Sequence, residues 1–414
     1  MGRSLFRKLL LDDSDEDEII KRVFMGSTSQ RKRRRFIRRN HLAGNERLYL
    51  DYFAESPVYP SNLFRRRFRM SCSLFLYILS KVEAHEPYFI QKRDNAKRLG
   101  LSSLQKMTAA LRMLVYGVTT DFMDEYVRIG ESTAIQCLKK FVAAILDIFS
   151  EEYLRSPNNK DIARLLAHGQ SCGFPGMLGS IDCMHWKWKN CPTAWKGMYC
   201  DHVCEPTIIL EAVASYDLWI WHAFFGLPSS NNDINGIERS RIFSKLAEGH
   251  APAVNYSING NDYTIGYYLV NDIYPKWSTF VKTIPAPLGQ KEKLFVEAQE
   301  THRKDVERAF EVLQTRFAIV RGPTRFFHLE MLQDIMKACI ILHNMIIEDE
   351  RDENEMVDFD YEQIDENCHT QVSREQTNEF MEFIQVHQCI GDQEVHSQLQ
   401  LDLVEHLWQL QDEL

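Results

Sequence analysis

Three places in the sequence carry side chains that could support a metal-dependent reaction. Asp182 ends the short apolar run "PGMLGSID", and Asn271 and Asp272 stand side by side after "YTIGYYLV". Glu307 lies in the helical stretch that comes next. In a layered α/β domain, strand ends and the helix facing them converge on one crevice. Convergent carboxylates hold Mg²⁺ or Mn²⁺, and such ions activate water at a phosphodiester. The alternative is that these acids only keep the strand ends hydrated.

The pair Asn271 and Asp272 decides how strong such a site can be. Neighbouring residues on a strand point to opposite faces, so only one of the two side chains faces the crevice. Asn271 keeps a carbonyl oxygen that can bind a metal, but it carries no negative charge. Asp272 supplies a carboxylate on the opposite face of a regular strand, so if Asn271 faces the crevice, only a β-bulge would turn Asp272 inward.

A mixed region of strands and helices is expected to position these side chains. The runs "PTIILEAVAS" and "LWIWHAFFGLP" flank a turn and predict a β-hairpin, whereas Val306, Phe310 and Leu313 form one helical stripe. This order predicts the α/β fold class. The expected elements are a strand ending at Asp182, strands at 206–215, 218–228 and 263–270, and helices at 234–247, 301–317 and 331–347.

Residues 102–147 are expected to form three helices. Ser102 and Gln105 have capping-box spacing before the first helix, and Thr133 and Gln136 repeat that spacing before the last. A short helix at 121–129 lies between them. Three short helices with a tight turn before the last fit a helix-turn-helix, and an ordinary helical bundle is the alternative. In the helix-turn-helix interpretation, the last helix offers three side chains to a DNA groove: Gln136, Lys139 and Lys140.

The stretch "HWKWKNCPTAWKGMY" at 185–199 interleaves tryptophans with lysines beside Asp182. Aromatic rings stack on exposed bases and lysines bind phosphates, so the stretch could contact DNA. Strand alternation instead predicts that Trp186 and Trp188 are buried together. The candidate DNA contacts are Lys187, Lys189 and Lys196.

Two further groups of residues have plain structural interpretations. Asp233 in "SSNNDIN" suits the N-cap of the helix predicted after it. Cysteines and histidines cluster between Cys183 and Cys204, but no pair has the C-x₂-C spacing of a zinc site, which favours buried thiols. His343, in "ILHN", lies on an apolar helix, which favours a core histidine.

Charge is distributed unevenly along the 414 residues, although the net charge is only -9. Residues 31–39 carry seven basic side chains, whereas the chain from Glu348 onward holds 20 acids and two arginines. The basic run suits nucleic acid or nuclear import, and the acidic part suits solvent or a protein partner. No apolar run is long enough for a membrane helix and the first residues lack a signal peptide, so we expect an intracellular protein with reduced cysteines.

Several motifs together resemble those of the Harbinger (P instability factor) superfamily of transposases, especially its domesticated plant relatives. They are "GSIDCMHW", "AWKGMYC", "YYLVNDIYP", "KDVERAFEVLQTRF" and "ACIILHNMI", and the resemblance covers roughly residues 60–350. It implies a ribonuclease-H-like catalytic domain preceded by a helix-turn-helix, and a DDE triad that binds Mg²⁺ or Mn²⁺. It also implies DNA ending in terminal inverted repeats as substrate and a Myb-like partner protein. Monomer and homo-oligomer both remain open, and the nucleus, with the cytoplasm as a second compartment, is the expected location.

Matched by motif, Asp182 takes the first triad position, Asn271 the second and Glu307 the third. Asp233 matches a further aspartate often seen in the family, which implies a supporting metal ligand at that position. The family has an aspartate where this chain has Asn271, and a small residue where it has Asp272. The sequence also has Glu311 and Asp201 where the resemblance leads us to expect glycine. We therefore expect a DNA nuclease and strand-transfer protein whose metal site is impaired. The alternative is a non-enzymatic DNA- or chromatin-associated protein that keeps the fold.

These interpretations divide the chain into four parts. The predicted regions are a disordered charged segment at 1–45, a helical region at 46–165, a ribonuclease-H-like domain at 172–350 and an acidic tail with short helices at 351–414.

Overall fold

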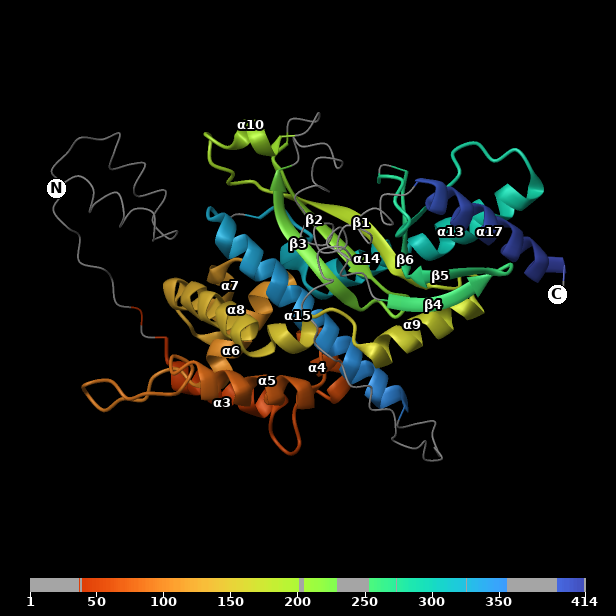
Figure 1. Ribbon diagram of the computed structural model, residues 1–414. Helices are drawn as coiled ribbons and strands as arrows, with labels where there is room; N and C mark the ends of the chain where they lie inside the picture. The colour runs from red at the N-terminus through yellow and green to blue at the C-terminus, as the bar shows by residue number, and fades with distance from the viewer. Residues whose placement is uncertain are drawn as a thin grey trace, which may run out of the picture. The chain divides into compact units, whose positions relative to one another are not determined.

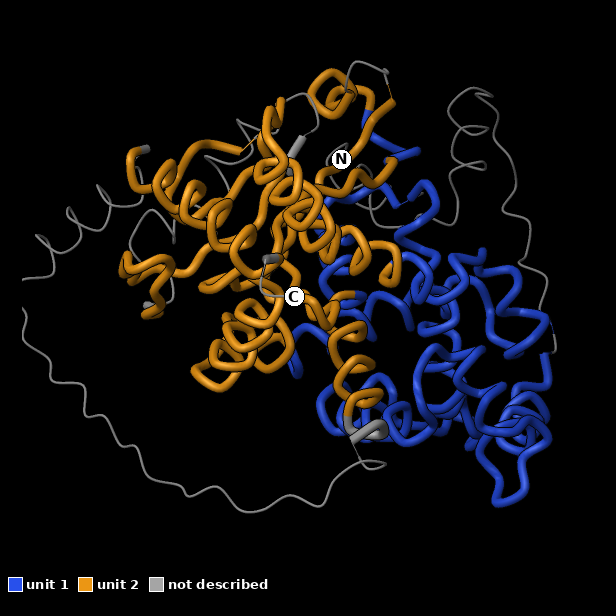
Figure 2. Tube along the Cα trace, turned by 90° about the vertical axis from the view of Figure 1, so that its right-hand side faces the viewer, with its two compact units in different colours: residues 1–149, 188–192, 314–339 blue, residues 150–187, 193–313, 340–414 orange. Residues whose placement is uncertain are grey.

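The protein, described here from a computed structural model, divides into two compact units, coloured separately in Figure 2. Unit 1 comprises residues 1–149, 188–192 and 314–339, and unit 2 comprises residues 150–187, 193–313 and 340–414. The structure describes residues 37, 39–200, 205–228, 253–272, 274–324, 326–355 and 393–412.

Unit 1 is helical and packs around aromatic side chains. The rings of Phe64 and Phe68 stack at a centroid distance of 4.3 Å, and Phe75 meets Phe68 edge to face. All three are buried; Phe64 and Phe68 lie one turn apart on α4, and Phe75 comes from α5. The helices of this unit are α3 (His41–Tyr52), α4 (Ser61–Phe68), α5 (Cys72–His85), α6 (Ser103–Tyr116), α7 (Thr120–Val127) and the 3-10 helix η1 (Ala318–Val320). Two longer helices, α8 (Glu131–Tyr153) and α15 (Leu329–Glu355), begin in unit 1 and end in unit 2.

The first predicted capping box is confirmed and the second is wrong. The Oγ of Ser102 accepts from the backbone N–H of Gln105, and the Gln105 side chain accepts in return from the N–H of Ser102. At the second position α8 already begins at Glu131, so Thr133 lies within its first turn and does not cap it.

Unit 2 contains a five-stranded mixed sheet with the order β3-β2-β1-β6-β7 (Figure 1). The strand β1 pairs antiparallel with β2 and parallel with β6, while β2 and β3 form the predicted hairpin. The α/β class is confirmed. The strands are β1 (Met177–Lys187), β2 (Thr207–Ala214), β3 (Ile220–Pro228), β6 (Tyr267–Val270) and β7 (Phe280–Lys282), and a separate hairpin has β4 (Ala253–Ile258) and β5 (Asn261–Ile265).

The single strand predicted at 263–270 is two strands in two different sheets. The chain passes from β5 to β6 at Gly266, where a Cβ atom would lie 2.6 Å from the Cδ1 of Leu178. Only glycine fits this close approach, so the run of apolar residues is interrupted at that point.

The five-stranded sheet separates two hydrophobic clusters. Along β6, Tyr267 and Leu269 belong to one cluster and Tyr268 and Val270 to the other, which is the alternation of a strand buried on both faces. Helix α13 (Gln290–Arg303) contributes Phe295 to the first cluster, so we call this side the α13 face. Helix α9 (Asn159–Ser171) packs Ile162 and Leu166 against the second cluster, on the α9 face. A register shift between Met177 and Gly179 marks a β-bulge in β1.

The helix predicted at 301–317 is broken into two. Helix α13 ends at Arg303, and α14 (Asp305–Arg316) begins after Lys304. The helix predicted at 331–347 is confirmed as the longer α15, and the one predicted at 234–247 lies outside the described residues. The remaining short helix is α10 (Lys196–Tyr199).

The C-terminal helix α17 (Gln393–Asp412) is part of the core of unit 2, in a region that the sequence suggested to be an acidic tail with short helices. Leu399, Leu403 and Leu407 recur every four residues and are buried on the α13 face. Glu405 pairs with Lys291 of α13 at 2.6 Å. Figure 1 shows α17 beside α13. Asp402 of the same helix is buried and its carboxylate accepts from Asn261 and Tyr263 of β5, so this acid also belongs to the packed part of the unit.

Candidate active site

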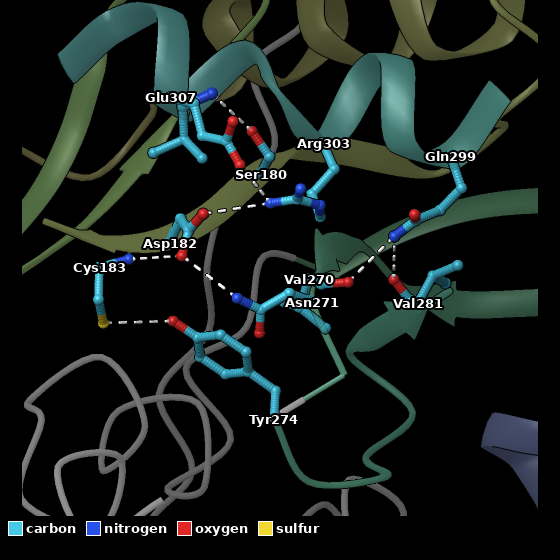
Figure 3. Close-up of polar contacts among 11 residues, drawn as sticks. Ser180, Asp182, Cys183, Val270, Asn271, Tyr274, Val281, Gln299, Arg303 and Glu307 are labelled. Atoms are coloured by element: carbon cyan, nitrogen blue, oxygen red, sulfur yellow. Dashed lines mark hydrogen bonds and ion pairs between the residues drawn. The ribbon is translucent and has the colours of Figure 1, made fainter. Parts of the chain in front are cut away.

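Strand β1 presents Ser180 and Asp182 to the α13 face, because residues two apart share a face. The Oγ of Ser180 accepts from the backbone N–H of Val306 at 3.1 Å. That N–H lies in the first turn of α14, where backbone donors have no partner within the helix. Ser180 thus fixes the start of α14 and, with it, the position of Glu307 (Figure 3).

Asn271 follows β6 on the same face as Tyr267 and Leu269. Its Nδ2 donates to the Oδ1 of Asp182 at 3.3 Å (Figure 3). Its Oδ1 is buried and has no hydrogen-bond partner among the described residues. A buried carbonyl oxygen beside a carboxylate is a suitable donor for a hard cation.

Arg303 joins the two acids of the site. Its guanidinium lies 3.1 Å from the Oδ2 of Asp182 and 2.7 Å from the Oε1 of Glu307. The amide of Gln299, one turn earlier, donates to the carbonyl oxygens of Val270 and Val281 at 3.0 and 3.2 Å. Helix α13 is thereby tied to the ends of β6 and β7, which holds Arg303 over the site.

Sequence reasoning missed Arg303, Ser180 and Gln299. The only signal was the four-residue spacing of Arg303 and Glu307, which is common between exposed residues of any helix. The structure departs from that ordinary pattern because the Arg303 side chain is only 15% exposed and also pairs with Asp182.

Burial dominates the electrostatics of Asp182. Burial raises the pKa of this carboxyl above its ordinary value. The N–H of Cys183, which donates at 2.8 Å, and the guanidinium of Arg303 lower the pKa, but they do not cancel the effect of burial. Two carboxylates and one guanidinium leave a single net negative charge on the group. An aspartate at position 271 would have added a second.

Asp272 does not join the other candidates, so its prediction as a metal ligand is not supported. Its carboxylate pairs with the Nζ of Lys282 at 3.2 Å, and its side chain is 59% exposed. Lys282 also donates to the carbonyl of Tyr274, which holds the ammonium on that side. Asn271 and Asp272 therefore point in different directions, as alternation predicts, and no bulge turns Asp272 inward.

Comparison with known proteins finds a match over the part of the chain that carries this site. Residues 151–354 match a family model described as plant transposon protein, a span that includes Asp182, Asn271 and Glu307. The chain is transposase-related. Residues 44–83 match a second model, described as a domain of unknown function. Neither a curated protein nor a solved structure matches the chain.

The lysines predicted to contact DNA in this transposase-related chain are all exposed, while two of the three neighbouring tryptophans are not. Trp186 and Trp188 are buried, as strand alternation predicts, whereas Trp195 is 40% exposed. Lys187 pairs with Glu205 at 2.5 Å. Contact with DNA thus remains a prediction for Lys187, Lys189 and Lys196.

The candidates on α8 differ in exposure. Gln136 is exposed, whereas Lys139 and Lys140 are half-buried. Lys140 pairs with Glu86 at 3.0 Å and lowers the pKa of that carboxyl. An intact pair of this kind competes with a phosphate for the same ammonium, so Gln136 is the most accessible of the three.

The other candidate metal positions have different outcomes. Asp233 lies outside the described residues. His343 is buried, with its Nε2 2.9 Å from the carbonyl oxygen of Leu218, which confirms a core histidine. Across the described part of the chain, no helix has the length and apolar character needed to cross a membrane.

Proposed function

We propose that this protein is a Harbinger-type, transposase-derived DNA nuclease and strand-transfer protein with a charge-deficient divalent-metal site. The observation that carries the proposal is the convergence of Asp182, Asn271 and Glu307 around Arg303, in a chain related to plant transposon proteins. The order of the sheet, with β1, β2 and β3 antiparallel and β6 and β7 parallel beside β1, supports a ribonuclease-H-like domain.

The donor set fits Mg²⁺ or Mn²⁺. Asp182 and Glu307 offer carboxylate oxygens, and Asn271 offers a buried carbonyl oxygen that lacks a hydrogen-bond partner within the described part of the chain. These are hard ligands, and none of the three is a thiol or imidazole. When bound, the metal would activate water and stabilise the leaving oxygen of a phosphodiester.

The surrounding residues position and balance these ligands. The N–H of Cys183 and the amide of Asn271 hold the Oδ1 of Asp182, while Arg303 holds its Oδ2. Arg303 can move its guanidinium towards a phosphate oxygen once a metal takes over the neutralisation of the two acids. The exposed lysines at 187, 189 and 196 are proposed to bind the phosphates of DNA outside the site.

A second function, as a non-enzymatic nuclear DNA- or chromatin-associated protein, is favoured by the same Arg303. Its guanidinium already pairs with both acids and neutralises one of their two charges, and Asn271 supplies no charge to attract a metal. In that case DNA binding, together with a Myb-like partner protein, is the activity that remains.

Nicking of a labelled duplex with a terminal inverted repeat, in Mn²⁺ or Mg²⁺, tests the choice. The unmodified protein should nick the duplex, Asp182→Asn should abolish nicking, and Asp272→Asn should leave it unchanged. DNA binding without nicking by the unmodified protein would select the second function. Nicking that survives Asp182→Asn would show that Asp182, Asn271 and Glu307 do not form the active site.

A further inference from the structure

A second group of metal-binding side chains lies where α9 and α13 end. His168 is in the last turn of α9, Cys172 follows that helix, and His302 is in the last turn of α13. One ligand atom from each of the three lies within 4.8 Å of the others, and all three residues are half-buried. Among the described residues, it is the one group of three histidine, cysteine or acidic side chains whose ligand atoms lie this close together.

The end of α9 fixes the thiol close to the first imidazole. The backbone N–H of Cys172 donates to the carbonyl of His168 at 3.1 Å, which places the two side chains on one side of the helix. The chain then folds back tightly, because a Cβ atom at Gly169 would lie 2.7 Å from the carbonyl oxygen of Phe174. The Sγ of Cys172 lies 3.4 Å from the Nε2 of His168.

Aromatic contacts fix the planes of the two imidazoles. The ring of His168 stacks on Tyr216 at a centroid distance of 3.7 Å and an angle of 17°. Tyr216 is held in turn by Arg164, which donates to its hydroxyl at 3.1 Å. His302 meets the ring of Phe174 at 5.6 Å and 72°. Neither histidine therefore needs to lose much side-chain freedom on binding an ion.

The chemistry of the three ligands selects the ion. A thiolate and two imidazoles form the soft to borderline set that zinc takes, and Mg²⁺ does not compete for it. In a tetrahedral zinc site, the sulfur and a nitrogen ligand are about 3.5 Å apart, given Zn–S near 2.3 Å and Zn–N near 2.0 Å. The separation of Cys172 and His168 already matches this geometry.

We propose that His168, Cys172 and His302 form a zinc site with water as the fourth ligand. The ion would join α9, which packs on one face of the sheet, to α13, which packs on the other. Because Arg303 follows His302, the ion would also fix the end of α13 from which Arg303 reaches Asp182 and Glu307.

Metal analysis of the full-length, tag-free protein tests this site without reference to DNA cleavage. After dialysis against excess Zn²⁺ and then metal-free buffer, we expect about one zinc per chain. Cys172→Ser and His302→Gln should each weaken zinc binding at least about tenfold. The paired variant Asp182→Asn with Glu307→Gln should retain the zinc, which separates this site from the candidate active site. Cys183→Ser, outside the cluster, is the matched cysteine control.

Cobalt tests for the thiolate ligand in the unmodified protein, where no variant has to fold. Co²⁺ added to the unmodified protein should give a thiolate-to-metal charge-transfer band with tetrahedral d–d absorption, and Cys172→Ser should lose the charge-transfer band. Absence of that band in the unmodified protein, or zinc that stays after Cys172→Ser, would overturn the proposal.

Discussion

The group around Asp182 (Asp182, Asn271, Glu307 and Arg303), here called the acidic site, and the cluster of His168, Cys172 and His302 are served by consecutive residues of α13, yet they differ in how charge is balanced. In the acidic site, Arg303 supplies a cation from within the protein and two carboxylates face it. The cluster instead brings together a thiol and two imidazoles, with ligand atoms no more than 4.8 Å apart. The acidic site must displace the guanidinium before it binds a metal, whereas the cluster has only to release the proton of the Cys172 thiol.

The largest effect should come from Asn271→Asp. Restoring a carboxylate beside Asp182 adds one negative charge to a buried group, so a metal competes better with Arg303. We expect Mn²⁺-dependent nicking to rise on the order of 100-fold, because changes around a metal alter affinity or activity by 10- to 100-fold. Rates measured across a Mn²⁺ titration check this. Asn271→Ser, which adds no charge, is the control, and an equal rise in both would refute the electrostatic explanation.

Ser180→Ala should destabilise the start of α14 beside Asp182 without changing the affinity of the cluster for zinc. It removes the acceptor of the Val306 N–H, which is buried at the start of α14, and an unsatisfied buried donor costs about 1–3 kcal/mol. Urea unfolding measures the loss of free energy, and Ser180→Thr, which keeps a hydroxyl, should recover most of it. An unchanged midpoint for Ser180→Ala would show that α14 does not depend on this contact.

Arg303→Gln should sharpen the contrast between the two regions. Removing the guanidinium takes the ion-pair partner from Asp182 and Glu307. The affinity of these residues for Mn²⁺ should therefore rise roughly tenfold, or about 1.4 kcal/mol. Zinc binding at the adjacent His302 should stay the same. Calorimetry with each ion reports both values, and a matched change in zinc affinity would mean that the two sites act as one.

Mild acid should reduce the stability of α17, the helix that packs against α13 and so supports both regions. His396 of α17 is buried with its Nδ1 3.0 Å from the carbonyl oxygen of Trp277, and burial lowers the pKa of its imidazole below the ordinary 6.5. Lys276 and Lys282 act in the same direction. The unfolded chain therefore binds more protons than the native one, and stability falls as the pH drops through about 6.5.

The stability that this histidine contributes should therefore decrease between pH 7 and pH 5. Hydrogen exchange of α17 and α13 should quicken over that range in the unmodified protein and change less in His396→Gln, which keeps a donor for Trp277. The same acceleration in both proteins would assign the effect to other groups.

Local signals explain which parts of the fold were predictable. The capping box at Ser102 and Gln105 depends on residues three apart, and the hairpin depends on two strands beside one turn. The break at Lys304 had no such signal, because neither glycine nor proline marks it. It follows from contacts made elsewhere, where Ser180 holds α14 and Gln299 holds α13.

The same distinction applies to the sites. Strand alternation indicated only that Asn271 and Asp272 point to opposite faces, the family resemblance placed Asn271 in the site, and the helix after the strand supplied Glu307. The pairing of Arg303 with Asp182, and the approach of His302 to Cys172, join residues that are distant in the sequence. Sequence spacing cannot reveal such pairs, because the packing of whole helices on the sheet creates them.

The β-bulge at Met177 and Gly179 decides which side chains of β1 point to which face of the sheet. Leu178 and Ile181 belong to the same hydrophobic cluster although they are three residues apart, because the bulge adds one residue to the strand. Deletion of a single residue there would turn each later side chain of β1 to the opposite face of the sheet. Ser180 and Asp182 would then turn into the apolar α9 face, and Ile181 would take their place opposite α14. A short deletion remote from the acids would thus remove the site as completely as replacing them.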